Sequence, residues 1–441
     1  MTDRGPWSGR RLHLVGIGGA GMSAYALAAH ALGAEVSGSD RAESPYLAPV
    51  RAAGIAVSIG HAAANVPAGD DVEVVHSTAI DAENPERAAA RDRGLADRSR
   101  AELLGELTRL RRVIGVAGAH GKTTTTSMIA HALLACGAAP GYLIGGELTT
   151  TGTNADWGTG EWLVVEADES DRSMLALDVD VAVVTNVELD HVDQYASLAE
   201  LQDAYRAFLA GAPERIVAPG LEALAGEGAR TFAPVGLELV PGGSRFEAEG
   251  VAVELHVPGE HNARNAAAAL AACARTGVDL ARAAAALSRF RGAERRFQEL
   301  GRTRAGARVI DDYAHHPTEV RATIEAARTL GARRVVAVFQ PHLFSRTRQF
   351  AREFGAALAL ADVACVLDVY PARERAEDFP GVRGLLVAEA AADHAGGREV
   401  MWMPAFDAAE RALRATLRDG DLCLVLGAGD VDTLAHRLVT P

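Results

Sequence analysis

Lysine is almost absent from this sequence of 441 residues. Lys122 is the only lysine, and every other one of the 44 basic residues is arginine. A compositional bias that removed all other lysines would have removed this one too, had arginine been able to replace it. Arginine presents a planar fork of donors, whereas lysine presents a compact point charge. We therefore predict that Lys122 performs a task that needs the point charge.

Positive charge as a whole is also scarce. The 58 acidic residues outnumber the basic ones, and the formal net charge is −14. Non-specific binding to nucleic acid or to an anionic membrane requires a basic surface. We therefore expect no nucleic-acid partner and no membrane partner, and any anionic ligand must be bound by a local cluster of basic groups.

Cysteines and long apolar runs are rare as well. The four cysteines lie far apart and form no CxxC pair, which is typical of reduced thiols packed as small apolar side chains: Cys136, Cys273, Cys365 and Cys423. A mostly apolar stretch at residues 12–32 is interrupted by two histidines and four glycines. It therefore predicts neither a targeting nor a transmembrane segment. These features indicate a cytoplasmic protein.

The remaining composition, 49% hydrophobic and 23% charged, is that of a globular protein. At roughly 100–200 residues per domain, the length predicts two to four domains. Three segments open with an apolar strand that leads through a loop into a helix, which is typical of α/β units with parallel sheets. These strand and helix pairs are 11–17 with 22–32, 112–117 with 123–136, and 308–310 with 317–330. We predict three α/β domains, at residues 1–108, 109–300 and 301–441.

Two further stretches bear on the organisation of the chain. Residues 289–308 hold seven arginines among glycines, at the predicted second boundary. Such a stretch is either a solvated linker or a source of positive charge for an anionic ligand. The alanine-rich stretch at residues 263–286 is predicted to be helical.

A phosphate-binding loop is predicted at residues 118–124, which read GAHGKTT between a strand and a helix. Backbone N–H groups at a helix N-terminus attract an anion, and Lys122 would add a mobile charge for the β and γ phosphates. Thr123 would offer its hydroxyl to Mg²⁺. The match to GxxxxGK[ST] is imperfect, because Val116 stands where the first glycine is required.

Polar residues also follow two later strands of the same segment. Residues 161–165 lead into Glu166, and residues 179–185 lead into Asn186, Asp190 and His191. Ligands of open α/β sheets bind at the carboxyl ends of the strands, so these groups should face the same crevice as Lys122. A carboxylate and an imidazole beside a triphosphate predict Mg²⁺ ligands.

The first loop supports a rival hypothesis. Gly16, Gly18 and Gly21 fit GxGxxG, and a second strand ends at Asp40, which could bind a ribose hydroxyl of a dinucleotide. This pattern would suit an NAD-dependent oxidoreductase. The same loop can bind any pyrophosphate, including that of a nucleotide sugar, and a dehydrogenase has no use for a separate loop that contains a lysine.

The third segment carries polar residues after two strands. The first strand leads into DDYAHHPTE from Asp311, where the adjacent histidines cannot both reach one metal ion without strain. Polar contacts to nucleotide and substrate are therefore favoured. The strand at 334–339 leads to Arg346 and Arg348, which we predict to form a fork for a carboxylate or phosphate.

Taken together, these motifs closely resemble the Mur ligases, and the resemblance spans nearly the whole chain. The motifs that carry it are GIGGAGMS from Gly16, HSTAI from His76, AGAHGKTTTT from Ala117, EADESD from Glu166, TNVELDHVD from Thr185, GEHNARNAAAA from Gly259, RRF from Arg295, DDYAHHPTE from Asp311 and FQPHLFSRTR from Phe339. The resemblance implies a Rossmann-like N-terminal domain, a central P-loop-type ATPase domain with a parallel sheet, and a Rossmann-like C-terminal domain.

The resemblance also implies roles for individual residues. ATP would be bound by Gly118, Ala119, His120, Gly121, Lys122, Thr123, Thr124, His261, Asn262, Asn265, Arg296 and Asp312. Mg²⁺ would be bound by Thr123, Glu166 and His191, and the catalytic groups would be Lys122, Glu166, His191 and Arg346. The UDP-sugar would be bound by Gly18, Gly19, Ala20, Gly21, Ser39, Asp40, His76, Ser77 and Thr78, and the remaining substrate contacts would come from Tyr313, His315, Arg346 and Arg348.

The implied activity is the ATP-dependent ligation of L-alanine to the lactyl carboxylate of UDP-N-acetylmuramate through an acyl phosphate, in peptidoglycan precursor synthesis. The alternative within the family is a recycling ligase that attaches a preformed peptide to the same sugar. DDYAHHPTE together with QPHLFSRT favours the alanine enzyme. Many family members have arginine where Leu343 stands, so any anion contact there must come from Arg346 or Arg348. We expect a monomer or a weak homodimer.

Overall fold

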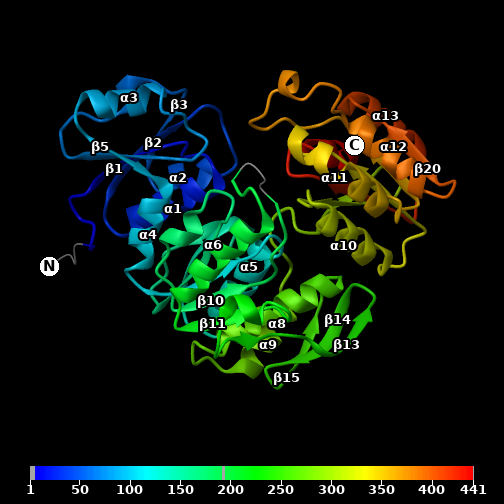
Figure 1. Cartoon of the computed structure of the whole chain (residues 1–441), viewed down its shortest axis with the longest axis horizontal. Helices are drawn as coiled ribbons and strands as arrows, with labels where there is room; N and C mark the ends of the chain where they lie inside the picture. Colours follow the sequence, from blue (N-terminus) through cyan, green and yellow to red (C-terminus); the bar gives the residue numbers. More distant parts are fainter. Residues whose placement is uncertain (1–4, 191–193, 441) are drawn as a thin grey trace. The chain divides into compact units, whose positions relative to one another are not determined.

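The fold is taken from a computed structural model that describes residues 5–190 and 194–440. The chain divides into two compact units, shown in Figure 1 in the colours of the sequence. The first unit extends to Val235 and includes residues 247–253 and 264–288. The second unit comprises residues 236–246 and 254–263 and the chain from Arg289 onward.

A five-stranded parallel sheet of order β3-β2-β1-β4-β5 opens the first unit. Its strands are β1 (Arg11–Val15), β2 (Glu35–Asp40), β3 (Ala56–Ile59), β4 (Val72–His76) and β5 (Ala96–Ser99). Its helices are α1 (Ala20–Ala31), α2 (Leu47–Ala52), the 3-10 helix η1 (Ala63–Asn65), α3 (Pro85–Asp92) and α4 (Arg100–Thr108). Helix α4 begins with a capping box, in which Ser99 and Glu102 satisfy each other's backbone N–H groups.

The second sheet of this unit has seven strands in the order β12-β11-β10-β6-β9-β7-β8, and among its strand pairs only β7 with β8 is antiparallel. The strands are β6 (Arg112–Ala117), β7 (Gly141–Leu148), β8 (Thr153–Asp156), β9 (Trp162–Glu166), β10 (Val181–Val184), β11 (Glu214–Val217) and β12 (Arg230–Thr231). The helices are α5 (Lys122–Ala135), η2 (Ser173–Ala176), α6 (Leu198–Ala210), α7 (Glu222–Ala225), α8 (Glu260–Cys273) and α9 (Leu280–Leu287). Because β6 lies between β9 and β10, the loops after these three strands meet at one edge of the sheet.

The last sheet belongs to the second unit and has the order β16-β17-β21-β18-β19-β20, with β16 antiparallel to β17 and the other pairs parallel. The strands are β16 (Gln298–Arg302), β17 (Arg308–Asp312), β18 (Arg334–Phe339), β19 (Val363–Val366), β20 (Glu399–Trp402) and β21 (Asp421–Leu426). The helices are α10 (Pro317–Arg328), α11 (Phe344–Leu358), η3 (Ala376–Asp378), α12 (Gly384–His394), α13 (Phe406–Thr416) and α14 (Asp432–Val439). A separate three-stranded sheet consists of β13 (Val235–Val240), β14 (Gly243–Ala248) and β15 (Val251–Leu255).

The predicted α/β class and its strand-loop-helix units are confirmed, and several bounds need correction. The strand predicted at 11–17 ends at Val15, and the helix predicted at 22–32 is α1 at Ala20–Ala31. The strand predicted at 308–310 continues through Asp311 and Asp312, because both residues pair with β21. The predicted helix at 263–286 is two helices, α8 and α9. The break includes Gly277 at φ +80° and Asp279, whose side chain accepts the first backbone N–H groups of α9.

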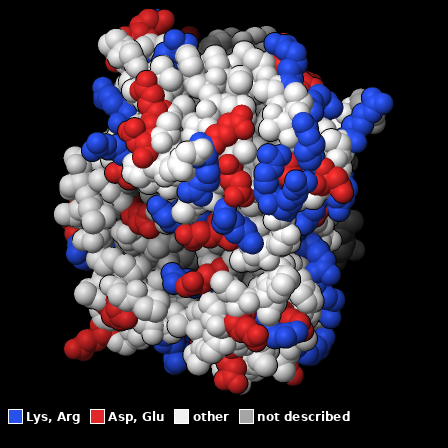
Figure 2. Space-filling model, turned by 90° about the vertical axis from the view of Figure 1, so that its right-hand side faces the viewer, with Lys and Arg blue, Asp and Glu red and all other residues white. Residues whose placement is uncertain are grey.

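Two of the seven arginines in the predicted boundary region, residues 289–308, hold the fold of the second unit together. Arg295 donates to Asp311 at 3.0 Å and to the carbonyl oxygens of Gly427 and Gly429. Arg308 donates to Glu299 at 2.8 Å. Figure 2 shows a face of the molecule on which basic and acidic side chains are intermingled in the same way. The linker interpretation therefore does not describe Arg295, which joins β17 to the loop after β21.

A buried polar network lies inside the first sheet of the first unit. Glu86, which is fully buried, accepts from Ser39 Oγ at 2.5 Å, Asn65 Nδ2 at 2.7 Å and the Ala62 N–H at 3.0 Å, and lies 3.1 Å from His13 Nε2. Burial alone would raise the pKa of Glu86, but these hydrogen bonds outweigh it and lower the pKa to about 2. The carboxylate therefore stays ionised and ties α3 to β1 and β2.

Within the described residues, no helix combines the length and apolar character needed to cross a membrane. The four cysteines are all free thiols.

Candidate active site

The loop between β6 and α5 has the conformation that a phosphate-binding loop requires. Gly118 and Gly121 have φ values of +142° and +81°, which are open to glycine and strained for other residues. A Cβ atom at Gly118 would collide with the Thr185 hydroxyl, and one at Gly121 would lie 2.5 Å from Asn265 Oδ1. Val116 is buried in β6, so the glycine missing from the sequence pattern falls inside the strand. Helix α5 begins at Lys122, so Lys122, Thr123 and Thr124 form its first turn, and His120 lies in the loop before it.

Lys122 is held by an acidic partner that the sequence analysis did not assign. Its ammonium group donates to Gly118 O at 2.6 Å and to both carboxylate oxygens of Glu169 at 2.9 Å. The side chains of Lys122 and Glu169 are only 14% and 3% exposed. Burial raises the pKa of Glu169 to about 7. The signal for Glu169 was present in the EADESD motif, since a buried lysine needs a nearby anion.

Thr123 and Glu166 form the oxygen cluster predicted for Mg²⁺. Thr123 Oγ1 donates to one Glu166 oxygen at 3.0 Å, and the Gly145 N–H donates to the other at 2.8 Å. A Cβ atom at Gly145 would lie 2.8 Å from the carboxylate, so glycine is needed beside it. Hydroxyl and carboxylate oxygens are the ligands that Mg²⁺ prefers, and these two residues therefore fit the ion. The third predicted ligand, His191, lies outside the described residues.

The residues after β10 fix the shape of the phosphate loop. The Asn186 side chain accepts from the His120 N–H at 2.9 Å and donates to His120 O at 2.8 Å, and the Thr185 hydroxyl donates to the same oxygen at 2.6 Å. His120 Nε2 lies 3.2 Å from Glu188. The strand order brings these groups together as predicted. Asn186 holds the main chain of His120 by hydrogen bonds to both its N–H and its C=O.

The predicted UDP-sugar residues gather at the carboxyl ends of β1, β2 and β4, and the side chain of one of them is not available to a ligand. Gly16 has φ +86° and packs against Ser77 and Ile80, which brings the glycine loop beside the loop that follows His76. Gly19 and Ala20 begin α1. Asp40 accepts the Gly18 N–H at 2.8 Å, so its carboxylate orders the loop itself. The unavailable side chain is that of Ser39, which is fully buried and bound to Glu86.

Arg100 connects this region to the acidic loop after β9, and the sequence analysis missed it. Its guanidinium lies 2.7 Å from Asp171 and 3.3 Å from Asp168, and its Nη1 would be 3.2 Å from a Cβ atom at Gly21. His76 is paired with Asp97 at 3.0 Å, and burial lowers the pKa of this histidine. A compact polar patch therefore joins the glycine loop to the loop of Glu166 and Glu169.

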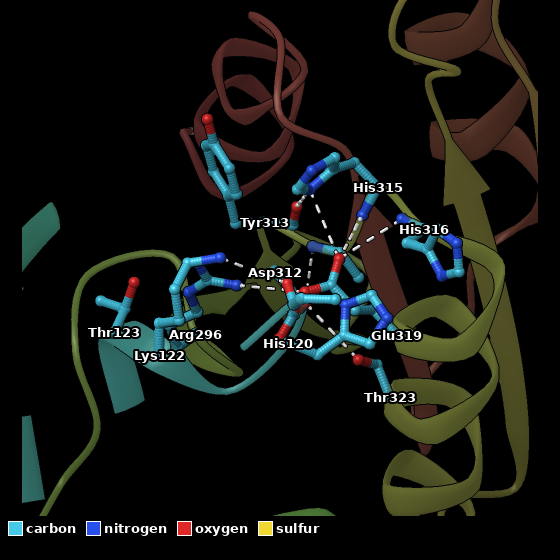
Figure 3. Close-up of polar contacts among 12 residues, drawn as sticks. His120, Lys122, Thr123, Arg296, Asp312, Tyr313, His315, His316, Glu319 and Thr323 are labelled. Atoms are coloured by element: carbon cyan, nitrogen blue, oxygen red, sulfur yellow. Dashed lines mark hydrogen bonds and ion pairs between the residues drawn. The ribbon is translucent and has the colours of Figure 1, made fainter. Parts of the chain in front are cut away.

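In the second unit, the predicted residues cluster after β17, as Figure 3 shows. Asp312 accepts from the Ala314 N–H and the Phe297 N–H, both at 2.8 Å, and burial raises the pKa of Asp312 to about 6. Glu319 caps α10 from within, since it accepts the N–H groups of His315 and His316. The ring of Tyr313 meets that of His315 edge to face at 5.3 Å.

The predicted fork of Arg346 and Arg348 is wrong. Both residues lie in the first turns of α11, and residues two apart on a helix point in different directions. Arg346 is 4% exposed and lies 3.2 Å from His342 Nδ1, whereas Arg348 is exposed and stacks on the Phe379 ring at 5.2 Å. Leu343, where an arginine was expected from the resemblance, is the residue before this helix and has φ +69°.

Three of the residues predicted to bind ATP, namely His261, Asn262 and Asn265, lie at the start of α8, whereas Arg296 lies elsewhere. Asn262 donates to Pro258 O at 2.8 Å, and His261 lies against Gly259. Asn265 lies against Gly121 of the phosphate loop. Arg296 lies 3.8 Å from Glu319, and its charge acts on Asp312.

Three family models match the chain in the order of its sheets. They are described as the Mur ligase family catalytic domain over residues 11–112, the Mur ligase middle domain over residues 116–220, and the Mur ligase glutamate ligase domain over residues 295–429. The phosphate loop, Glu166 and Asn186 fall within the second match, and Asp312 and Arg346 within the third.

Individual relatives resemble the chain over its full length. A UDP-N-acetylmuramate--L-alanine ligase from Kineococcus radiotolerans is 48% identical, over 97% of this chain and 95% of that protein. The crystal structure of UDP-N-acetylmuramate-alanine ligase MurC from Thermotoga maritima is 28% identical and superposes with a TM-score of 0.83, over 97% of this chain and 98% of that one. A murein peptide ligase from Psychrobacter arcticus is 26% identical, with a TM-score of 0.70 and 98% of both chains covered.

Proposed function

The chain belongs to the Mur ligase family, and we propose that it joins L-alanine to the lactyl carboxylate of UDP-N-acetylmuramate while ATP is converted to ADP and phosphate. The observation that carries the proposal is the cluster of Lys122, Thr123 and Glu166 on a glycine loop at the carboxyl edge of a parallel sheet. The name of the relative that is 48% identical supports alanine as the amino acid.

We also propose the three predicted domains, 1–108, 109–300 and 301–441, as the functional divisions of the chain. The glycine loop of Gly18 and the loop of His76 would bind the UDP-sugar, and the loop at 118–124 would bind ATP. Tyr313, His315 and Arg346 would bind the incoming alanine, with Arg346 opposite its carboxylate. The four free cysteines support a location in the cytoplasm.

The first chemical step brings two anions together. A lactyl carboxylate oxygen attacks the γ-phosphorus of ATP, and the bond from this phosphorus to the β–γ bridging oxygen breaks, which gives an acyl phosphate and ADP. The Lys122 ammonium offsets the repulsion once it moves from Glu169 to the phosphate oxygens. Bound Mg²⁺, held by Thr123 and Glu166, would neutralise phosphate charge in the same place.

In the second step the neutral amine of alanine attacks the acyl carbon. A tetrahedral intermediate forms, and it collapses when the bond from the acyl carbon to the phosphate oxygen breaks. One proton of the amine leaves with the inorganic phosphate, and the amide remains. The phosphate loop must keep its shape through both steps, and Thr185 and Asn186 hold it through the main chain of His120. Arg346 would hold the alanine carboxylate so that the amine points at the acyl phosphate.

The experiment that tests this function measures phosphate release by the full-length protein with ATP, Mg²⁺ and UDP-N-acetylmuramate. We expect turnover to depend on L-alanine, with lower rates for glycine and L-serine, and no effect of NAD or NADP. Mass spectrometry should find the alanylated UDP-sugar. Turnover with a preformed murein peptide but not with L-alanine would instead assign the recycling activity, and reduction of NAD would assign an oxidoreductase.

A further inference from the structure

Helix α11, which begins at Phe344 and carries Arg346, lacks a capping residue of its own. The residue before it is Leu343, which offers no side-chain acceptor and holds φ +69° and ψ +136°. The first N–H groups of a helix need partners from outside the helix. A non-glycine residue in such a conformation is strained and persists only where its surroundings hold it there.

A segment after β19 supplies what the helix lacks. We call residues 370–379 the strap. Glu374 accepts the Ser345 N–H at 3.0 Å with one carboxylate oxygen and the Ser345 hydroxyl with the other. A carboxylate beside the N-terminus of a helix also interacts favourably with the helix dipole. The strap thus provides the cap that Leu343 cannot provide.

The strap holds the turn before α11 at further points. The Leu343 N–H donates to Tyr370 O at 2.9 Å, and the Tyr370 N–H donates to Pro341 O at 2.8 Å. The Tyr370 ring stacks on His342 with centroids 5.7 Å apart, and Phe379 stacks on Phe344 at 5.9 Å. These contacts fix the strained turn from both sides.

Arg346 depends on this turn because it lies next to Ser345 and is buried. Its guanidinium lies 3.2 Å from His342 Nδ1, and His342 itself packs on Tyr370. A change in the first turn of α11 therefore moves the backbone of Arg346, while its side chain has little room to adjust. The strap consequently controls where the guanidinium points.

We propose that Glu374 is a positioning residue for Arg346: by capping α11 it holds the guanidinium where the alanine carboxylate binds, an inference that rests on the proposed function. Glu374 acts through the helix and does not itself contact the substrate. Its removal should therefore weaken alanine binding selectively. The residues proposed to bind ATP and the UDP-sugar lie far from the strap in the sequence, so their positions should not change.

The test uses the full-length protein and the variants Glu374→Ala, Glu374→Gln and Glu377→Gln. Glu377 is the matched control, since it is an acidic residue of the same strap that pairs with Arg375 at 3.4 Å and is about 77% exposed. Glu374→Ala should raise KM for L-alanine about tenfold and change KM for ATP and for UDP-N-acetylmuramate less than twofold. Glu374→Gln keeps an acceptor for the Ser345 N–H and should restore part of the loss, whereas Glu377→Gln should behave as wild type.

Two further measurements separate positioning from general stability. In an Arg346→Ala background, Glu374→Ala should add no further rise in KM for L-alanine, because its effect passes through Arg346. Hydrogen–deuterium exchange of the peptide at 341–350 should become faster in Glu374→Ala and stay unchanged in Glu377→Gln. A full additional effect in the Arg346→Ala background, an equal rise of all three KM values, or unchanged exchange would overturn the proposal. Absence of alanine ligation in the wild type would refute the proposed function, and the exchange result would still decide whether Glu374 orders the turn.

Discussion

The contact between Lys122 and Glu169 predicts that the Glu169 carboxylate competes with a bound nucleotide for the Lys122 ammonium group. The ammonium group has three N–H donors, and the short contacts to Gly118 O and to both Glu169 oxygens occupy them. To reach a phosphate, Lys122 must leave Glu169. We therefore expect Glu169→Gln to bind ADP more tightly than the wild type, because the amide holds the ammonium less strongly than the carboxylate does.

The size of the effect follows from the strength of the contacts. A hydrogen bond to a charged partner contributes about 1.5–3 kcal/mol and a neutral one about 0.5–1.5 kcal/mol. A difference of about 1–2 kcal/mol corresponds to roughly five- to thirtyfold tighter binding of ADP. In the free protein the same substitution leaves a buried cation without its counter-ion, which should reduce the free energy of unfolding by roughly 3 kcal/mol. Affinity and stability should therefore change in opposite directions.

The assay combines calorimetric titration with Mg²⁺ and ADP and thermal unfolding with and without these ligands. Glu161→Gln is the matched control, since Glu161 is exposed and pairs with Arg112 at the other end of β9. The Glu169 variant should have a lower Tm than the control when free and a larger rise in Tm on binding. Weaker ADP binding in Glu169→Gln would refute the reasoning, because it would mean that Glu169 helps to hold the bound nucleotide.

The same contact predicts a pH dependence of nucleotide binding. Burial raises the pKa of Glu169 to about 7 while Lys122 still favours its ionised form. When Lys122 moves to the phosphates, the carboxylate remains buried near Asp168, Tyr195 and Tyr205, and its pKa should rise further. Binding should therefore take up a proton above pH 7, and ADP affinity should fall as the pH rises through 7. Titrations in buffers of different ionisation enthalpy measure this uptake, and Glu169→Gln should lack it.

Three further predictions concern single residues. Because the pKa of Glu86 is lowered to about 2 in the folded protein, its ionised form contributes about 3 kcal/mol to the free energy of unfolding above pH 4.5, and this contribution is lost as the pH falls toward 2. Urea unfolding between pH 7 and pH 3 should show most of this loss in the wild type and not in Glu86→Gln. Asn186→Ala removes two hydrogen bonds from the His120 peptide, at about 1 kcal/mol each, and should raise KM for ATP about tenfold or more in the phosphate assay, whereas a normal KM would show that the loop keeps its shape without them. Lys122→Arg should abolish turnover, because the buried space beside Gly118 O accepts a compact ammonium; near-normal activity would contradict our explanation of why one lysine remains.

Local sequence patterns were enough to predict the α/β class, the strand-loop-helix units and the position of the phosphate loop. These features depend on local patterns, namely apolar strand runs, glycines at loop positions and residues at helix starts. Strands β6 and β18 have the predicted bounds, β2 ends at Asp40 as predicted, and Thr123 and Glu166 meet at the carboxyl edge of the sheet as expected. That expectation succeeded because parallel strands end at the same edge, whatever their order.

The pairing of side chains, in contrast, could be read only from the folded chain. Glu169 reaches Lys122 because β9 lies next to β6, and this strand order is not written in the local sequence. Ser39 is buried because Glu86 from a distant helix binds its hydroxyl. Arg346 and Arg348 point in different directions because α11 begins at Phe344, so both arginines lie on the helix. Glu374 caps this helix at Ser345, which is 29 residues away in the chain. Such contacts arise from packing between elements far apart in sequence, where no local periodicity or spacing specifies the partner.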